Sequence, residues 1–140
     1  MIRARFFVAG DPAPQGSKRI VQPKGHRRPL LLEMSKKLPA WRTAVAAEAL
    51  IARQRLPGPF TGPVYARMLF TFRSPKKPTR SYPGLDLDKL LRSTNDALVH
   101  GQLLLDDRQV VEVQAGKRWA VGGEASGCTI TIADMPLTFA

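Results

Sequence analysis

Residues 86–107 read DLDKLLRSTNDALVHGQLLLDD. In the first part of this stretch, from Asp86 to His100, apolar side chains recur at helical spacing along one face, and Gly101 follows as a typical helix terminator. Acidic side chains stand at the entrance of this helix and again just beyond its end. The stretch therefore predicts an amphipathic helix flanked by carboxylates.

The segments on either side of this helix predict a sheet and a second helix. Apolar residues alternate with less apolar ones through Val64–Phe72, which is the period expected of a strand with one buried face. Other short runs are rich in the branched and aromatic residues that favour strands. The pattern predicts a single α+β domain, residues 1–140, in which a mixed β-sheet packs with helices. We expect strands at Arg3–Ala9, Val64–Phe72, Val110–Val113 and Cys128–Ala133, and helices at Ala40–Leu56 and Asp86–His100.

The composition points to a polyanionic partner. The chain has 140 residues, and its 22 Lys and Arg against 11 Asp and Glu leave a formal net charge of +11, with a pI of about 10.7. This excess is larger than solubility requires, so nucleic acid is the expected partner. No stretch approaches the roughly 18 apolar residues of a membrane span, and Met1–Gly10 does not resemble a secretion signal. We expect a cytoplasmic protein with no membrane partner.

The basic residues gather in two proline-rich segments. Gly10–Pro39 is dominated by prolines, glycines and cations and predicts a basic N-terminal loop. Within it, Leu30–Leu32 indicates a short strand that touches the body of the domain. Ser74–Gly84 combines prolines with lysines and an arginine, so it predicts an extended basic loop that cannot join the sheet. This second loop leads directly into the acidic helix.

Cations in these two segments are candidates for phosphate contacts, although a generally solvated basic surface is the simpler alternative. Tyr82 is a candidate for stacking on an opened base, and Lys89 is a further cation on the helix. Trp41 and Trp119 are better explained by packing. The segment around Gly16 lacks the residue spacing of a nucleotide-binding loop, so we expect no nucleotide cofactor. The predicted DNA-binding residues are Lys18, Arg19, Lys76, Lys77, Arg80, Tyr82 and Lys89.

Any catalytic metal in this chain must be held mainly by oxygen. The one cysteine, Cys128, and the two histidines, His26 and His100, are too few for a cysteine-based or multi-histidine zinc centre. We expect Cys128 to be a buried thiol. Magnesium prefers carboxylate, water and phosphate oxygens, which makes the acids around the helix its candidate ligands.

The spacing of these acids allows a metal site and also a structural role. Asp86 and Asp88 can face one site if they lie at the helix entrance, where the backbone is still turning. Asp107 lies 19 residues beyond Asp88, and a helix, a tight turn and a returning strand would bring it back beside that entrance. In the structural alternative, Asp86 caps the helix, Asp88 favours its positive end, and Asp106 with Asp107 forms a turn. Local spacing alone favours this alternative.

The whole pattern resembles the RusA family of Holliday junction resolvases. The central resemblance runs from about Leu85 to Val111, and a second one covers the opening of the chain. The matching residues are Asp86-Leu87-Asp88, Leu90, Asp96-Ala97-Leu98, Gly101, Asp106-Asp107 and Val110, together with Val8, Gly10, Pro12, Pro14, Gln15, Gly16, Ser17, Lys18 and Arg19.

The resemblance implies a site, a partner and a reaction. Asp86, Asp88 and Asp107 would bind catalytic Mg²⁺, with Mn²⁺ as a substitute, and Asp106 would be a secondary ligand candidate. The protein would act as a homodimer that resolves four-way DNA junctions by paired symmetric nicks in recombination and repair, and two-fold symmetry suits such a dimer. The resemblance also implies a phage or prophage source.

One residue of the helix departs from the family pattern. Arg92 stands where some RusA proteins have a functional lysine, and its guanidinium keeps the charge but cannot act as a proton donor. We therefore count Arg92 among the catalytic candidates as a phosphate clamp, with Lys89 as the alternative cation. Asp96 matches the family, yet helix packing or hydrogen bonding explains it better than metal ligation.

The leading hypothesis is thus a magnesium-dependent endodeoxyribonuclease for branched DNA. A nuclease that prefers flaps or forks is the near alternative, because a metal site and basic loops do not specify branch geometry. A non-catalytic nucleic-acid-binding accessory protein is the alternative from another class, because net charge alone does not distinguish it.

Overall fold

The computed structural model describes residues 1–16, 18–21, 24–25, 30–33 and 36–137, with backbone alone for 18–21 and 30–33. A short 3₁₀ helix, η1, follows the second α-helix. In chain order the elements are β1 (Arg3–Ala9), β2 (Lys18–Val21), β3 (Leu30–Glu33), α1 (Leu38–Gln54), β4 (Val64–Phe72), α2 (Leu87–His100), η1 (Asp107–Gln109), β5 (Val110–Trp119) and β6 (Gly127–Ala133).

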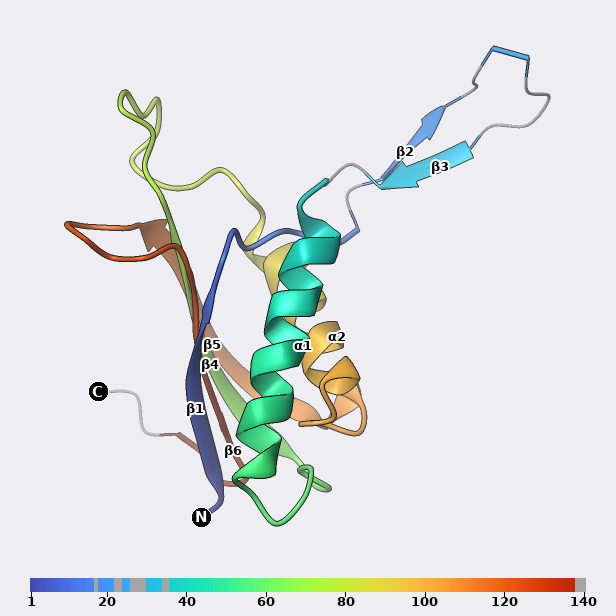
Figure 1. The fold of residues 1–140 in the computed structure, drawn as a ribbon, viewed down its shortest axis with the longest axis vertical. Helices are drawn as coiled ribbons and strands as arrows, with labels where there is room; N and C mark the ends of the chain where they lie inside the picture. Colours follow the sequence, from blue (N-terminus) through green and yellow to red (C-terminus); the bar gives the residue numbers. More distant parts are fainter. Residues whose placement is uncertain (17, 22–23, 26–29, 34–35, 138–140) are drawn as a thin grey trace.

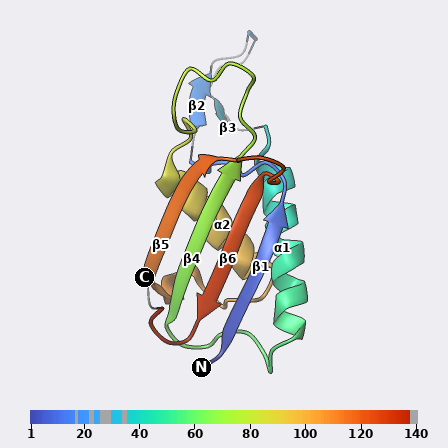
Figure 2. The same cartoon turned by 90° about the vertical axis from the view of Figure 1, so that its left-hand side faces the viewer.

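Four strands form one mixed sheet in the order β1-β6-β4-β5. The pairs β1–β6 and β4–β6 are antiparallel, whereas β4 and β5 are parallel. Both helices lie on one face of this sheet, and Figure 2 shows the opposite face turned towards the viewer with the helices behind it. The predicted α+β domain, with a mixed sheet packed with helices, is therefore confirmed. Among the described residues, no helix is long and apolar enough to cross a membrane.

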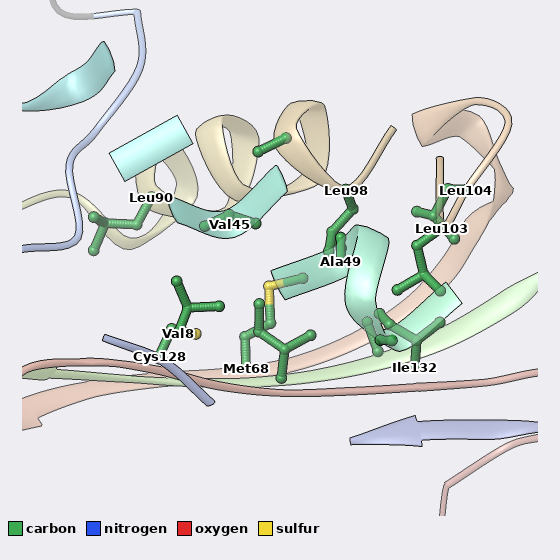
Figure 3. Packing of buried hydrophobic residues seen from close by; sticks show 14 of the residues in the cluster. Val8, Val45, Ala49, Met68, Leu90, Leu98, Leu103, Leu104, Cys128 and Ile132 are labelled. Atoms are coloured by element: carbon green, nitrogen blue, oxygen red, sulfur yellow. The ribbon is translucent and has the colours of Figure 1, made fainter. Parts of the chain in front are cut away.

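The core lies between the sheet and the two helices. The predicted alternation along β4 is confirmed, because Met68 and Phe70 are fully buried beneath the helices. Helix α2 contributes Leu90 and Leu98, and α1 contributes Val45 (Figure 3). Burying each such side chain stabilises the fold by roughly 1.5–3 kcal/mol. The core therefore fixes the orientation of α2 relative to the sheet.

Most element boundaries follow the sequence prediction. The strands predicted at Arg3–Ala9 and Val64–Phe72 have the predicted bounds, and the first helix begins at Leu38, slightly before the predicted start. Pro39 stands in its first turn, where a missing N–H costs no helical hydrogen bond. Cys128 is the expected buried thiol, and burial raises its pKa, which keeps it unreactive.

The basic N-terminal loop contains a hairpin. Strand β3 confirms the predicted short strand at Leu30–Leu32, and it pairs antiparallel with β2 as a separate two-stranded sheet. The hairpin projects from the end of the molecule at which α1 and α2 begin (Figure 1). The expected contact of these leucines with the body concerns side chains outside the described ones.

Gly101, at the end of α2, lies tightly against α1. It is buried, and a Cβ there would lie 2.5 Å from the Ala46 carbonyl oxygen and 2.7 Å from Ala49 Cβ. Because both neighbours belong to helix α1, neither can move without moving the helix. The glycine predicted as a helix terminator thus also sets the distance between α1 and α2.

We expect Gly101→Ala to lower the free energy of unfolding by about 1–3 kcal/mol, because the added methyl group forces the helices apart. The measurement is urea denaturation followed by circular dichroism. Gly58→Ala is the matched control, since a Cβ at Gly58 meets nothing within 4 Å. Equal stability of the two variants would contradict a tight helix contact at Gly101.

Candidate active site

The entrance of α2 presents two exposed carboxylates. Asp86 occupies the N-cap position, but its side chain makes no capping hydrogen bond and is 62% exposed. Asp88 is exposed in the first turn. The Asp86 carboxylate lies 3.4 Å from the ammonium of Lys89, its i+3 neighbour. The alternative in which the Asp86 side chain caps the helix is therefore wrong, and the carboxylate is left facing solvent.

Lys117, on β5, holds the peptide that leads into this pair. Its ammonium donates to the carbonyl oxygens of Pro83 at 2.8 Å and Leu85 at 2.6 Å, and it lies 5.6 Å from the centre of the Tyr82 ring. Sequence reasoning missed this residue. Lys117 lies beyond the predicted strand Val110–Val113. The available signal was the alternation of Val111, Val113, Ala115 and Trp119, in which Lys117 is the one cation.

Trp119, at the end of β5, holds the basic loop that precedes α2. Its side chain packs partly against the core, as predicted, and its indole N–H donates to the Arg80 carbonyl oxygen at 3.0 Å. The Arg80 guanidinium folds back on Gly84, where a Cβ would collide with it. Lys76, Lys77, Arg80 and Tyr82 are exposed in this loop. Figure 1 shows the loop at the same end of the molecule as the start of α2.

The opening segment of the chain is fastened along α2. The Gln15 amide N–H donates to the Lys89 carbonyl oxygen at 3.1 Å, and its side-chain Nε2 donates to Asp96 Oδ2 at 2.8 Å. The buried hydroxyl of Ser93 donates to the Ala13 carbonyl oxygen at 2.6 Å. The opening segment and α2, the two parts of the sequence that resemble the RusA family, are therefore in direct contact. They also give Asp96 the hydrogen-bonding role that the sequence predicted.

Arg92 lies where the N-terminal segment leaves the helix. A Cβ at Gly16 would come within 2.9 Å of Arg92 Nη1, and Gly16 has a φ of +90°, a conformation that favours glycine. The guanidinium is otherwise exposed. Lys18 and Arg19, the other predicted cations of this segment, have side chains outside the described ones.

Asp106 and Asp107 lie at the far end of α2. Asp106 caps η1 by accepting from the Arg108 amide N–H at 2.8 Å, and its carboxylate pairs with the Arg108 guanidinium at 3.1 Å. The side-chain hydrogen bond from Arg108 is the main cause that lowers the pKa of Asp106 to about 2. Asp107 is exposed beside it. The turn role proposed in the structural alternative is therefore confirmed for Asp106.

The acids at the two ends of α2 are not brought together within one chain. The helix rises about 18 Å between Asp88 and His100, at about 1.5 Å per residue, and His100 and Asp107 line the same hollow. Strand β5 does return to the helix entrance, but it brings Lys117 there instead of Asp107. In the part of the chain that the structure describes, no three His, Cys, Asp or Glu side chains are placed to hold one metal ion.

The amino-acid sequence matches a family of DNA-cleaving proteins. The family described as endodeoxyribonuclease RusA matches residues 9–133, which include all the carboxylates discussed above. The chain therefore belongs to the RusA endodeoxyribonuclease family. No curated protein matches the chain closely enough to serve as a relative.

We expect Gln15→Ala to lower the free energy of unfolding by about 1 kcal/mol, because the Asp96 carboxylate loses a charge-assisted hydrogen bond. Urea denaturation measures the decrease. Gln54→Ala, on the exposed surface at the end of α1, should change stability by no more than about 0.5 kcal/mol. If the two variants are equally stable, Gln15 does not fasten the N-terminal segment.

Proposed function

We propose that this endodeoxyribonuclease cuts branched DNA, with the four-way Holliday junction as its preferred substrate, during recombination and repair. One observation carries the proposal: an exposed carboxylate pair, Asp86 and Asp88, stands at a helix start that is surrounded by basic segments. Carboxylates suit a metal ion, and the surrounding cations suit the phosphates of several DNA arms.

The carboxylate pair fits a magnesium ion. Mg²⁺ in proteins is commonly held by one or two carboxylates, with water and substrate phosphate in its other positions. Asp86 and Asp88 supply two such groups, and both are open to solvent. Mn²⁺ accepts the same oxygen ligands. When bound here, the ion would neutralise developing phosphate charge and make a water molecule more acidic.

Several residues of the chain prepare the phosphate for attack. The N-terminus of α2 carries the positive end of the helix dipole, which favours a phosphate beside Asp88. Arg92 offers a guanidinium fork that can hold a phosphate, and its place against Gly16 limits its freedom. Lys117 keeps the peptide before Asp86 in a single position. A proton donor is still required, and Arg92 does not supply it.

The positions of the basic segments support contacts with the arms of a branch. The β2–β3 hairpin and the loop before α2 project from the same end of the molecule (Figure 1). Lys76, Lys77 and Arg80 are exposed on that loop, and neither lysine is held in an ion pair among the described residues. These side chains can therefore exchange solvent counterions for DNA phosphates.

A homodimer would give Asp107 a place in the metal site. Within one chain Asp107 is about a helix length from Asp88, so it can join a carboxylate pair only in a second copy. Strand β5 forms an edge of the sheet, and Val111 and Val113 on it are 56% and 41% exposed. An unpaired edge with exposed apolar residues favours association. Asp106 is the weaker ligand candidate because its carboxylate is already paired with the Arg108 guanidinium.

We expect Asp86→Asn, Asp88→Asn and Asp107→Asn each to reduce cleavage at least about 100-fold, because each removes a carboxylate ligand of the metal ion. Junction binding should persist, because each substitution also removes a negative charge that repels DNA phosphates. Labelled four-way, flap, fork and linear DNA are incubated with Mg²⁺ or with a chelator. Paired nicks on the four-way DNA support the resolvase. Preferential cutting of flaps or forks would show that these, and not four-way junctions, are the preferred substrate. Binding with no cutting of any DNA would favour an accessory protein.

Mixing two inactive variants tests whether the site is shared. If Asp107 completes the partner's site, a dimer of Asp88→Asn with Asp107→Asn contains one intact site, so the mixture regains cleavage as single nicks. If each site lies within one chain, both sites of that dimer are damaged and the mixture stays inactive. Each variant alone serves as the control.

We expect the double substitution of Lys76 and Lys77 by alanine to weaken junction binding and to flatten its salt dependence. The slope of log K against log salt should fall by about 0.9 for each phosphate that the variant no longer neutralises. Fluorescence anisotropy over a salt series measures it. Arg55→Ala removes an exposed cation at the opposite end of α1 and should leave the slope unchanged. An unaltered slope in the lysine variant would exclude these lysines as phosphate contacts.

A further inference from the structure

A cleft of about 750 Å³ opens beside the carboxylate pair. Its walls come from the N-terminal segment, the end of β4, the basic loop before α2 and the connection after β5. Leu85 lines the cleft and is bonded directly to Asp86, so the cleft and the acid pair are separated by one residue. No residue of the cleft belongs to the predicted site.

The lining of the cleft combines aromatic and other apolar side chains with charged ones. Phe72 and Trp119 contribute aromatic surface, and prolines such as Pro12 and Pro75 add more apolar area. Arg73 also lines the cleft and is exposed. Lys37 and Asp11 line it too, 3.3 Å apart, and both remain largely exposed. Aromatic surface with cations around it suits a ligand that has a flat apolar part and a negative charge.

We propose that this cleft receives one unstacked nucleobase of the DNA strand whose phosphate lies at Asp86 and Asp88. The inference rests on the proposed function and deepens it by assigning a binding site for a base. A nucleotide combines a flat ring with a phosphate, which matches the aromatic side chains and the Arg73 cation that line the cleft. The volume lies within the range that encloses small organic ligands.

A branched DNA substrate can supply an unstacked nucleobase for the cleft. Moving a base out of an intact duplex costs a few kcal/mol, and the cost is lowest for a base that is already unpaired or poorly stacked. Bases at a branch point meet that condition. Consecutive Cα atoms are only about 3.8 Å apart, so a nucleotide next to the phosphate at Asp86 can reach the wall formed by Leu85.

The walls of the cleft are held in place before any ligand arrives. Trp119 is bonded to the Arg80 carbonyl, and Lys117 to the carbonyls of Pro83 and Leu85. On the other side, Arg118 forms two hydrogen bonds of 2.6 Å with Glu124, which anchors the connection to β6. A preformed cavity loses little entropy when it binds a base.

The test couples a change in the protein to the loss of a base in the DNA. Four-way junctions each carry one abasic site at a nucleotide flanking the branch point, and their dissociation constants are measured by fluorescence anisotropy with Ca²⁺ in place of Mg²⁺, since Ca²⁺ also takes carboxylate ligands. A denaturing gel shows that the strands stay intact. For wild-type protein, one abasic position should weaken binding at least about fivefold, since a stacked base contributes about 1–3 kcal/mol. For Trp119→Leu, the intact junction should bind correspondingly more weakly, and the same abasic site should then have no further effect.

A second variant and a control keep the test independent of folding. Ser126→Phe adds a large side chain to the lining of the cleft without removing one, and it should also abolish the abasic effect. Phe7→Leu removes an exposed aromatic side chain elsewhere, on β1, and should keep the effect. Thermal unfolding shows that each variant is folded.

The outcomes separate this inference from the proposed function. If the wild-type protein binds the junction and no abasic position matters, or if the abasic and cleft effects simply multiply, the base site is wrong while junction binding stands. If the wild-type protein binds four-way DNA no better than linear duplex, the proposed function fails together with the base site. Loss of the abasic effect in both cleft variants supports the inference.

Discussion

The parallel pairing of β4 with β5 is the constraint on which the rest of the structure depends. Two parallel neighbours require a crossover, and here the crossover is α2, which must run back against the direction of both strands. The start of α2 therefore lies where the two strands end, and its last turn lies where β5 begins. Asp86 and Asp88, at the start of α2, therefore lie where β4 and β5 end. Asp107, beyond the last turn of α2, lies at the opposite end, where β5 begins.

Other basic or candidate features lie at the end of the molecule where α2 begins. Helix α1 also begins there, and the β2–β3 hairpin and the basic loop leave the body beside it (Figure 1). The exposed pair Asp86 and Asp88 thus lies next to segments that are rich in cations. In the proposed function these cations attract DNA phosphates towards the pair, and the pair supplies the oxygen atoms that a divalent cation needs.

Local periodicity was enough to predict most of the elements, although it missed β2 and the second half of β5. It was not enough to predict their partners. The alternation through Val64–Phe72 and the helical spacing after Asp86 depend on neighbours within a few residues, so both predictions hold. Gln15 and Asp96 are 81 residues apart, and Lys117 and Pro83 are 34 apart. No local pattern encodes such distances, because they are set by how the helices pack on the sheet.

The sequence by itself determined the α+β class, the positive charge and the family, and it supplied the candidate carboxylates, because each of these depends on composition, periodicity or motif. Only the tertiary structure decided which groups meet. It placed Lys117 instead of Asp107 at the entrance of α2, and it formed the cleft beside Leu85. The physical reason is that strand direction fixes which end of an element lies beside the site, and sequence separation does not reveal strand direction.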